Sequence, residues 1–458
     1  MQELSAKTES FSATLRQSPL LRLLALGVLT LLLLIPAGWT SELIAERSAR
    51  REETVEDVVS KWGRTQTLAG PVLVAPYQRR RIEKNAAGKD IEKTEQRYLT
   101  VLPDVLTVRA NVDGEERYRG IFVVPVYRLR LEVSGELRLP DLKALDIEPG
   151  SVEWSRARIV VGLSDARAIQ NRAVLTWNGE ERPFLPGGGG VVPAGIHASL
   201  DAAPAEKATF SFQLDANGSS GVHFAPIGQE TTVTIDSNWA TPSFQGNWLP
   251  SERTVDADGF SATWRIPFLG RNQPQAWTTA ADETARCLAD TPFGVDLRLP
   301  VDAHRMADRS VKYAQLFIVL TFGAIWVVEV MARVRVHPIQ YLMIGAALCT
   351  FYVLELALAE HIGFGGAYAL ASASIVALIA AYAVVVLRGW RRGAGVAALI
   401  SGLYIYLYVL LTNEDYALLL GSIGLFVALA IAMLLTRRID WYELGDGPQP
   451  AAAPTGLG

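Results

Sequence analysis

Six long apolar segments limit what this chain can fold into. Each is close to the length that a helix needs to cross the ~30 Å hydrocarbon core of a bilayer, which is about 20 residues at ~1.5 Å per residue. One segment lies near the N-terminus, and the other five follow one another in the last third of the chain. The predicted spans are residues 20–40, 313–332, 339–359, 367–387, 394–412 and 416–435. The sequence therefore predicts a multi-pass membrane protein with a large water-facing part after its first span.

The composition excludes several other classes of protein. Half of the 458 residues are hydrophobic and only 20% are charged, which is too apolar for an intrinsically disordered chain. Two cysteines cannot form a disulfide framework. The net charge of −4 provides no basic field that would hold nucleic acid. We therefore expect the lipid bilayer as a partner and no nucleic acid.

The first span has two interpretations. Lys7 and Arg16 precede its apolar run, as in a cleaved signal peptide. However, the run is long, and the sequence Pro36-Ala37-Gly38-Trp39 that follows it is a poor cleavage site. We expect an uncleaved anchor.

Seven arginines are sorted onto alternate connections of the predicted spans. They are Arg333, Arg335, Arg388, Arg391, Arg392, Arg437 and Arg438. The connections between them, residues 360–366 and 413–415, hold no lysine or arginine. Because cytoplasmic loops are enriched in basic residues, we expect residues 1–19 and 436–458 to be cytoplasmic. Residues 41–312 are then periplasmic, with 313–435 forming a five-helix membrane domain.

The exported region is predicted to be rich in β-structure. After a short helix over residues 41–62, apolar and polar residues alternate along residues 127–133, 210–214 and 233–235. Turn signals separate such runs at Asp113-Gly114, Asn178-Gly179 and Asn217-Gly218. We expect an α+β membrane protein whose periplasmic domain is mainly antiparallel, as one sandwich or two β lobes.

The sequence contains no strong signature of an enzyme. It has no G-x-S-x-G, Walker or H-E-x-x-H motif, and its five histidines show no metal-binding spacing. The stretch Ser164-Asp165-x-Arg167 is typical of a capped turn. Cys287 and Cys349 are predicted at different depths, so we expect no disulfide between them. We accordingly predict no catalytic residue, cofactor or metal ion.

A polar cluster is predicted at the outer membrane boundary. Glu360 and His361 end the third span, and Glu414 and Asp415 begin the sixth. A histidine beside carboxylates titrates near neutral pH and could sense or relay protons. The alternative is that these acidic loops simply face water.

Two acids lie inside predicted spans, where ionisable residues are functional candidates by default. Glu329 is three residues from the inner end of its span and could pair with Arg333. Glu355 is four residues from the outer end of its own, where snorkelling would reach water. Glu329 is the secondary candidate of the sequence.

Several motifs together resemble the CreD family of bacterial inner-membrane proteins. They include Leu43-Ile44-x-Glu46-Arg47, Arg117-Tyr118-Arg119-Gly120-Ile121, Pro242-Ser243-Phe244-x-Gly246, His337-Pro338-x-Gln340-Tyr341, Glu360-His361-Ile362-Gly363-Phe364 and Glu414-Asp415-Tyr416-Ala417-Leu418-Leu419. The resemblance implies a cell-envelope integrity protein expressed under a two-component system. It also implies links to colicin tolerance and the β-lactam stress response, and it supplies no catalytic residues.

We therefore predict a non-enzymatic inner-membrane protein whose periplasmic β domain binds an envelope component or a protein partner. One alternative is an ion-coupled transporter or channel, although the spans show no matched broken helices. Another is an enzyme acting on envelope lipid or peptidoglycan, with a site around Glu360, His361, Glu414 and Asp415. The sequence gives no indication of the oligomeric state.

Overall fold

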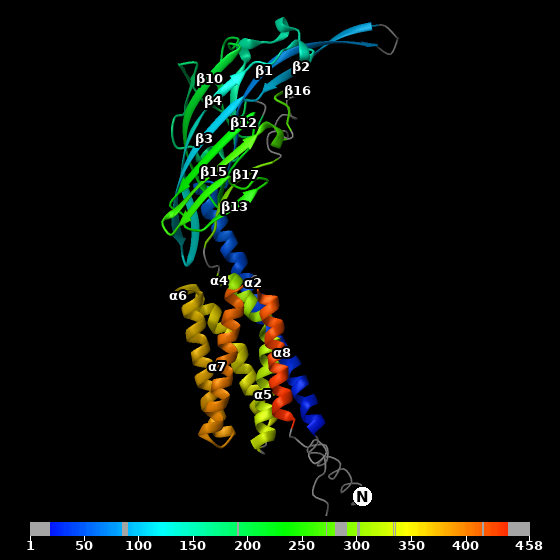
Figure 1. The fold of residues 1–458 in the computed structure, drawn as a ribbon, viewed down its shortest axis with the longest axis vertical. Helices are drawn as coiled ribbons and strands as arrows, with labels where there is room; N and C mark the ends of the chain where they lie inside the picture. Colours follow the sequence, from blue (N-terminus) through cyan, green and yellow to red (C-terminus); the bar gives the residue numbers. More distant parts are fainter. Residues whose placement is uncertain are drawn as a thin grey trace, which may run out of the picture. The chain divides into compact units, whose positions relative to one another are not determined.

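The computed structural model of the chain divides into two compact units (Figure 1). One unit comprises Met1–Arg51 and Val301–Gly458, and the other is Glu52–Pro300. The residues described are 19–84, 90–189, 192–271, 273–279, 291–299, 303–332, 334, 336–414 and 416–437. We call the first the membrane unit and the second the β unit. The mixed α+β class predicted from the sequence is confirmed.

The β unit contains two sheets. One has nine strands, with the path β13-β17-β11-β1-β5-β9-β8 and with β2 and β16 added beside β1. The other has eight strands in the order β14-β15-β12-β3-β4-β10-β6-β7. The strands are β1 Gln66–Lys84, β2 Asp90–Val101, β3 Val105–Arg119, β4 Phe122–Arg138, β5 Arg158–Leu163, β6 Val174–Trp177, β7 Glu180–Pro183, β8 Leu185–Pro186, β9 Gly195–Ser199, β10 Lys207–Ser219, β11 Gly221–Phe224, β12 Glu230–Ser237, β13 Pro242–Gly246, β14 Glu252–Asp256, β15 Gly259–Pro267, β16 Ala276–Thr279 and β17 Phe293–Leu297.

Both sheets are mixed, although most of their described strand pairs are antiparallel, as expected from the sequence. The pairs β1–β11 and β3–β12 are parallel, and the other described pairs are antiparallel. Parallel neighbours are joined by long crossover connections rather than by hairpins. Periodicity within one strand carries no information about such a partner, so the sequence could not reveal these two pairs.

The inward faces of the two sheets share one hydrophobic core. In β4, Leu129, Leu131 and Val133 are buried, whereas Arg128 and Arg130 between them are exposed. The same core includes buried side chains of the nine-stranded sheet, such as those of β1 and β5. The two sheets therefore pack face to face as in a β-sandwich, in agreement with the alternation of apolar and polar residues in the sequence.

One of the three predicted turns is confirmed, and two are wrong. Asn178 and Gly179 join β6 to β7 with φ of 50° and 87°, as a hairpin turn requires. Gly114 and Gly218 instead lie inside β3 and β10. A Cβ atom on Gly114 would approach the Trp239 ring to 2.8 Å, and one on Gly218 would approach the Tyr127 ring to 2.3 Å. At these two positions the absence of a side chain leaves space for an aromatic ring, and neither glycine forms a turn.

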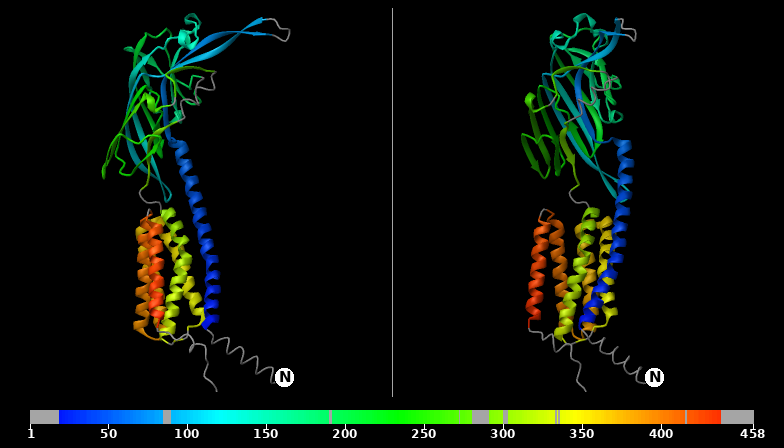
Figure 2. Two further views of the ribbon diagram at one scale, coloured as in Figure 1. Left: turned by 45° about the vertical axis from the view of Figure 1, so that its right-hand side comes forward. Right: turned by 90° about the vertical axis from the view of Figure 1, so that its right-hand side faces the viewer.

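Strands β1 and β2 continue as a two-stranded ribbon beyond the rest of the β unit (Figure 2). Their pairing runs from Leu73 with Val101 to Lys84 with Asp90, whereas β5 accompanies β1 only as far as Val74.

The membrane unit is helical. Its described elements are most of α2 Pro19–Trp62, then α4 Ala303–Lys312, α5 Ala314–Ala332, α6 Pro338–Val386, α7 Trp390–Thr412 and α8 Ala417–Thr436. The predicted first span and the helix expected after it form the single helix α2, which contains Pro36.

The prediction of six separate spans is wrong. Among the described residues, four helices are long and apolar enough to cross a membrane, or five if α4 and α5, bent by 46°, are counted as one span. The main reason is that the predicted third and fourth spans belong to the single element α6. The predicted loop of residues 360–366 is helical apart from a break at Gly363, where φ is 74° and ψ is 164°.

The break at Gly363 folds α6 back on itself. The rings of Phe351 and Tyr368, on opposite sides of the break, have centroids 5.4 Å apart. Seventeen residues of straight helix would separate them by ~25 Å. The two halves of α6 are therefore antiparallel neighbours, each of about 24 residues, or ~36 Å.

Candidate functional site

The sequence-predicted acids at the ends of the helices are organised by α4, which the sequence analysis did not identify. Glu360 faces His304 of α4, with 3.7 Å between Oε1 and Nε2, and each side chain is only 11% exposed. Glu414 pairs with Arg305 at 3.1 Å and with Arg309 at 3.4 Å. Both acids therefore reach the same short helix. We call this set of side chains, with Ser310 and Glu355 described below, the α4 layer.

The other two members of the predicted cluster do not take part in these contacts. His361 is exposed, and its side chain forms no described hydrogen bond or ion pair. Asp415 lies outside the described residues. A sequence signal for α4 was available, because the apolar residues Ala307 and Val311 are spaced as on one face of a helix. Both are buried, while Arg305 and Lys312 are exposed.

Glu355 is the least expected member of the α4 layer. Its side chain is fully buried rather than snorkelling to the helix end. The Ser310 hydroxyl of α4 donates a hydrogen bond of 2.8 Å to Glu355 Oε2. Glu355 Oε1 has no hydrogen-bond partner among the described residues. Buried polar atoms are normally paired, so this oxygen marks the site as unusual.

Glu329 is buried at the other end of the membrane unit and has a structural explanation. Its Oε2 accepts a 2.8 Å hydrogen bond from the Tyr341 hydroxyl, and Oε1 accepts one of 3.2 Å from the Val336 amide. It therefore fixes the connection between α5 and α6. The predicted partner Arg333 lies outside the described residues.

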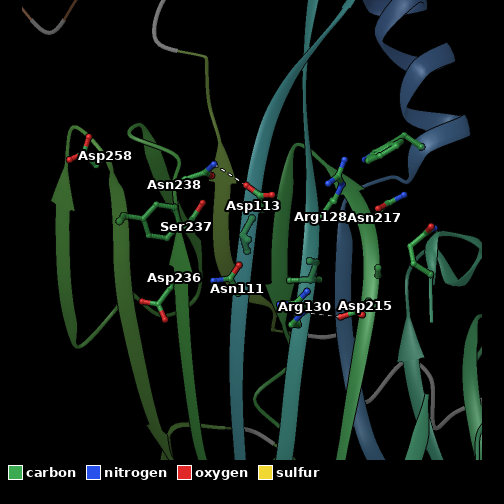
Figure 3. A pocket seen from close by; sticks show the side chains of 16 residues that line it. Asn111, Asp113, Arg128, Arg130, Asp215, Asn217, Asp236, Ser237, Asn238 and Asp258 are labelled. Carbon is green, nitrogen blue, oxygen red and sulfur yellow. Dashed lines mark hydrogen bonds and ion pairs between the residues drawn. The ribbon is translucent and has the colours of Figure 1, made fainter. Parts of the chain in front are cut away.

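A second site lies on the outward face of the eight-stranded sheet (Figure 3). It is a groove of about 810 Å³, within the size range of ligand sites. Cross-strand register creates it: Asp236 of β12, Asn111 of β3, Arg130 of β4 and Asp215 of β10 form one continuous row. Four strands distant in sequence thus contribute one line of polar side chains.

A parallel row completes the lining of the groove. It contains Asn238, Asp113, Arg128 and Asn217. The Asn238 amide donates a 3.0 Å hydrogen bond to Asp113, and Arg130 lies 3.5 Å from Asp215. Asp236 and Asp258 are exposed and have no described ion pair. Amide and carboxylate groups therefore remain available to a polar ligand, with an excess of negative charge.

Trp62 borders this groove at the end of α2. Its indole Nε1 donates to the Tyr127 carbonyl at 3.3 Å, and the Arg117 guanidinium lies 3.5 Å from the ring centroid. The neighbouring side chains of α2 pack against Val124 and Val126 of β4. The aromatic wall of the groove is therefore held rigidly by the sheet.

The groups needed for a metal site are not assembled in the described residues. No three His, Cys, Asp or Glu side chains lie close enough there to hold a metal ion. Cys349 is buried, and Cys287 lies outside the described residues.

Asp165 joins the chain that follows α2 to the body of the β unit. Its buried carboxylate accepts hydrogen bonds from the Arg64 amide at 3.4 Å and from Arg167 Nε at 3.0 Å. The Gln66 amide donates to the Asp165 carbonyl at 3.4 Å and to the Asn217 carbonyl at 2.9 Å. The turn predicted at residues 164–167 is present, but the Asp165 side chain does not cap it and instead connects distant segments.

Replacing Asp165 with alanine is expected to destabilise the β unit by ~1–3 kcal/mol, because the Arg64 amide loses its buried acceptor. Burial acts to raise the pKa of Asp165, but the hydrogen bonds from Arg167 and the Arg64 amide outweigh it and hold the pKa below its usual range. This stabilisation is present above the unfolded-state pKa near ~3.9 and is lost as the pH falls through the folded-state pKa. Denaturant unfolding followed by proteolysis of the β unit, at pH 7 and in acid, measures both effects.

Arg167→Ala is the matched control, because the Arg167 side chain is largely exposed and its loss should cost less than ~1 kcal/mol. Equal destabilisation by the two variants would contradict the assigned role of Asp165.

Comparison with known proteins places nearly the whole chain in one family. The family model described as "Inner membrane protein CreD" matches residues 18–442. The Escherichia coli K12 protein "Inner membrane protein CreD" is 32% identical over 422 residues, which cover 90% of this chain and 91% of that protein. A solved structure, an M1 zinc metallopeptidase mutant from Deinococcus radiodurans bound to a Tyr-Ser-Ala substrate, has 11% identity and a TM-score of 0.20. That match covers 47% of this chain and 54% of the peptidase. Nearly the whole chain matches the family model and the bacterial relative, and it belongs to the CreD family of inner membrane proteins.

Proposed function

We propose that this protein maintains the cell envelope without catalysing a reaction, by binding an envelope component or a protein partner in the groove of the β unit. The groove itself carries the proposal. It presents two rows of amides, carboxylates and guanidinium groups at fixed cross-strand spacing, beside a clamped tryptophan. Such a lining suits recognition by many hydrogen bonds rather than the positioning of one nucleophile.

The proposed orientation places the β unit in the periplasm, with both termini in the cytoplasm. Support comes from the charges at the two ends of the membrane unit. Arg388, Arg391 and Arg392 lie at the connection of α6 to α7, and Arg437 follows α8. Arg333, Arg335 and Arg438 lie outside the described residues. At the other end, the connections contain Glu360 and Glu414, and residues 360–366 and 413–414 contain no lysine or arginine.

In this proposal each half of α6 crosses the bilayer separately. The antiparallel contact of Phe351 with Tyr368 supports it, as does the ~36 Å length of each half. The proposed orientation returns the C-terminus to the cytoplasm. Reporter fusions near residues 200 and 445 test this: a cytoplasmic reporter active at residue 200 would overturn it.

The enzyme alternative is less well supported by the α4 layer. General acid–base catalysis needs a base within reach of a substrate. Here Glu414 is engaged by two arginines and Glu360 faces His304.

A photo-crosslinking residue at position 111, in the full-length protein in cells, tests the proposed groove. We expect a covalent adduct whose yield falls at least tenfold when Asp236 and Arg130 are both replaced by alanine. The physical reason is that both side chains flank position 111 in the same row. Mass spectrometry of the adduct shows whether the partner is a protein or another envelope component.

The matched control is a crosslinker at Thr254, an exposed position of β14 that does not line the groove. The same double variant should fail to restore colicin tolerance or β-lactam response in a deletion strain. An adduct at position 111 that is unaffected by the double variant, together with full complementation, would contradict the proposal.

A further inference from the structure

We propose that the contact between α4 and α6 is a proton-binding relay, in which the His304–Glu360 pair exchanges protons with water and Glu355 is the buried carboxyl that receives them. This relay lies in the membrane unit and is independent of ligand binding in the groove. The ligand that this site binds is a proton. The observations that support it are the surroundings of Glu355, the stacking of two acidic sites along one helix contact, and the Ser310 hydroxyl that is bonded to Glu355.

The surroundings of Glu355 favour a neutral acid. The described groups that interact with it are uncharged: the Ser310 hydroxyl from α4, Tyr352 and Tyr368 from α6, and Tyr404 from α7. Cys349 is also close in this part of the core. An ionised carboxylate buried without a cation carries a large desolvation penalty, which a proton removes.

The arginine adjacent to Ser310 does not serve as a counter-charge. Arg309 pairs with Glu414 at 3.4 Å and donates to the Leu410 carbonyl at 3.4 Å. Its side chain is therefore committed to the end of α7, while Ser310 bonds to Glu355. A proton on Glu355 neutralises the carboxyl where the described residues provide no positive charge.

The two acidic sites are stacked along one interface. His304 faces Glu360, and six residues later Ser310 contacts Glu355, five residues earlier in α6. The two helices therefore run antiparallel, and the sites lie ~7–8 Å apart along α6. The pair at Glu360 is near the helix ends beside Arg305 and Glu414, whereas Glu355 is fully buried. The two sites therefore form a path from the surface of the membrane unit to its core.

Ser310 supplies the chemistry of transfer. A hydroxyl donates one proton and accepts another. A proton released by the His304–Glu360 pair passes through water to Ser310 Oγ, while the original Ser310 proton moves along its 2.8 Å hydrogen bond to Glu355 Oε2. At the pair, the N–H or O–H bond that held the proton breaks as an O–H bond forms on water, and at each later step one O–H bond breaks as another forms. The acceptor is Glu355 in its carboxylate form, which becomes neutral; the pair loses one unit of positive charge, and no charge remains on the water or the serine.

The core around Glu355 has a second buried polar atom without a partner. The Tyr404 hydroxyl forms no described hydrogen bond, although the Tyr368 hydroxyl donates to the Tyr404 carbonyl at 2.7 Å. Two buried oxygens without described hydrogen-bond partners therefore lie among side chains that interact with one another. This arrangement favours a mobile proton over a fixed structural hydrogen bond. A metal cation would require several oxygen ligands, and Glu355 is the single carboxylate described here.

Infrared spectroscopy of the full-length protein in lipid nanodiscs tests the site. We expect a C=O stretching band of a protonated, water-shielded carboxylic acid at neutral pH, and we expect Glu355→Gln to abolish it. Glu329→Gln is the matched control, because Glu329 is equally buried but accepts hydrogen bonds from Tyr341 and Val336. If Glu355→Gln does not fold, Glu355→Asp should shift the band instead.

The relay is tested by the rate at which the Glu355 band shifts in deuterium oxide. Glu360→Gln and His304→Gln should each slow that shift at least tenfold while the band itself remains. His361→Gln, which removes an exposed neighbour, should leave the rate unchanged. A band that survives in Glu355→Gln would overturn the proton site, and an unchanged rate in Glu360→Gln would overturn the relay. Neither result depends on ligand binding in the groove.

Discussion

Replacing Trp264 with alanine is expected to destabilise the β unit by ~3–5 kcal/mol, in the range found for large aromatic residues removed from a core. Trp264 of β15 is fully buried. Its ring lies 5.7 Å from that of Phe293 and 5.8 Å from that of Phe244, which belong to β17 and β13 of the other sheet. Its indole nitrogen donates a 3.1 Å hydrogen bond to the Trp248 carbonyl. The loss therefore combines a cavity between the sheets with an unsatisfied carbonyl.

The measurement is pulse proteolysis of the full-length protein across a denaturant series, which reports the β unit separately from the helices. Trp264→Phe retains much of the ring volume and should cost clearly less than the alanine variant. Leu269→Ala is the surface control, because that side chain is 92% exposed. Destabilisation of Trp264→Ala by less than ~1 kcal/mol would show that this ring does not hold the two sheets together.

The strands were predicted correctly where the sequence of a single segment determines which side chains face the core. Residues 127–133 and 210–214 alternate in burial, as their sequences indicate, because each strand has one face in the core and one in water. The order and direction of neighbouring strands are set by contacts between distant segments. The parallel pair β3–β12 and the row of polar residues along the groove were therefore outside the reach of sequence periodicity.

The membrane half shows a similar division between local and tertiary information. Hydropathy identified the apolar helices, because a bilayer-spanning length is a local property of the sequence. The connection predicted at residues 360–366 coincides with the break at Gly363, but the residues on both sides of the break remain helical. The α4 layer was missed because the charges of α4 lay in the predicted periplasmic region. Glu360 and Glu414 were predicted to lie at one level, and both contact α4, but their partners on α4 were not predicted.

Glycine at position 363 is expected to be essential for the fold-back of α6. At φ 74° and ψ 164°, its backbone is in a region that side-chain-bearing residues almost never adopt, at a cost of ~1–3 kcal/mol. A Cβ atom there would meet no other atom within 4 Å, so the cost arises from the backbone alone. Gly363→Ala should therefore destabilise the membrane unit, and Gly363→Val should do so more strongly, because β-branching adds backbone restriction.

Unfolding in mixed micelles of increasing SDS content measures this effect in the full-length protein. Gly402→Ala in α7 is the matched control, since its added Cβ also meets nothing within 4 Å and alanine favours a helix. The control should be neutral or slightly stabilising, whereas Gly363→Ala should unfold at a lower SDS fraction and lose the packing of Phe351 against Tyr368. The turn at Gly363 places Tyr368 and Tyr404 beside Glu355. Gly363→Ala should therefore also weaken the infrared band of the protonated Glu355 carboxyl. Identical unfolding of the two variants would mean that α6 tolerates a side chain at its turn, and that the antiparallel pairing of its halves does not depend on glycine.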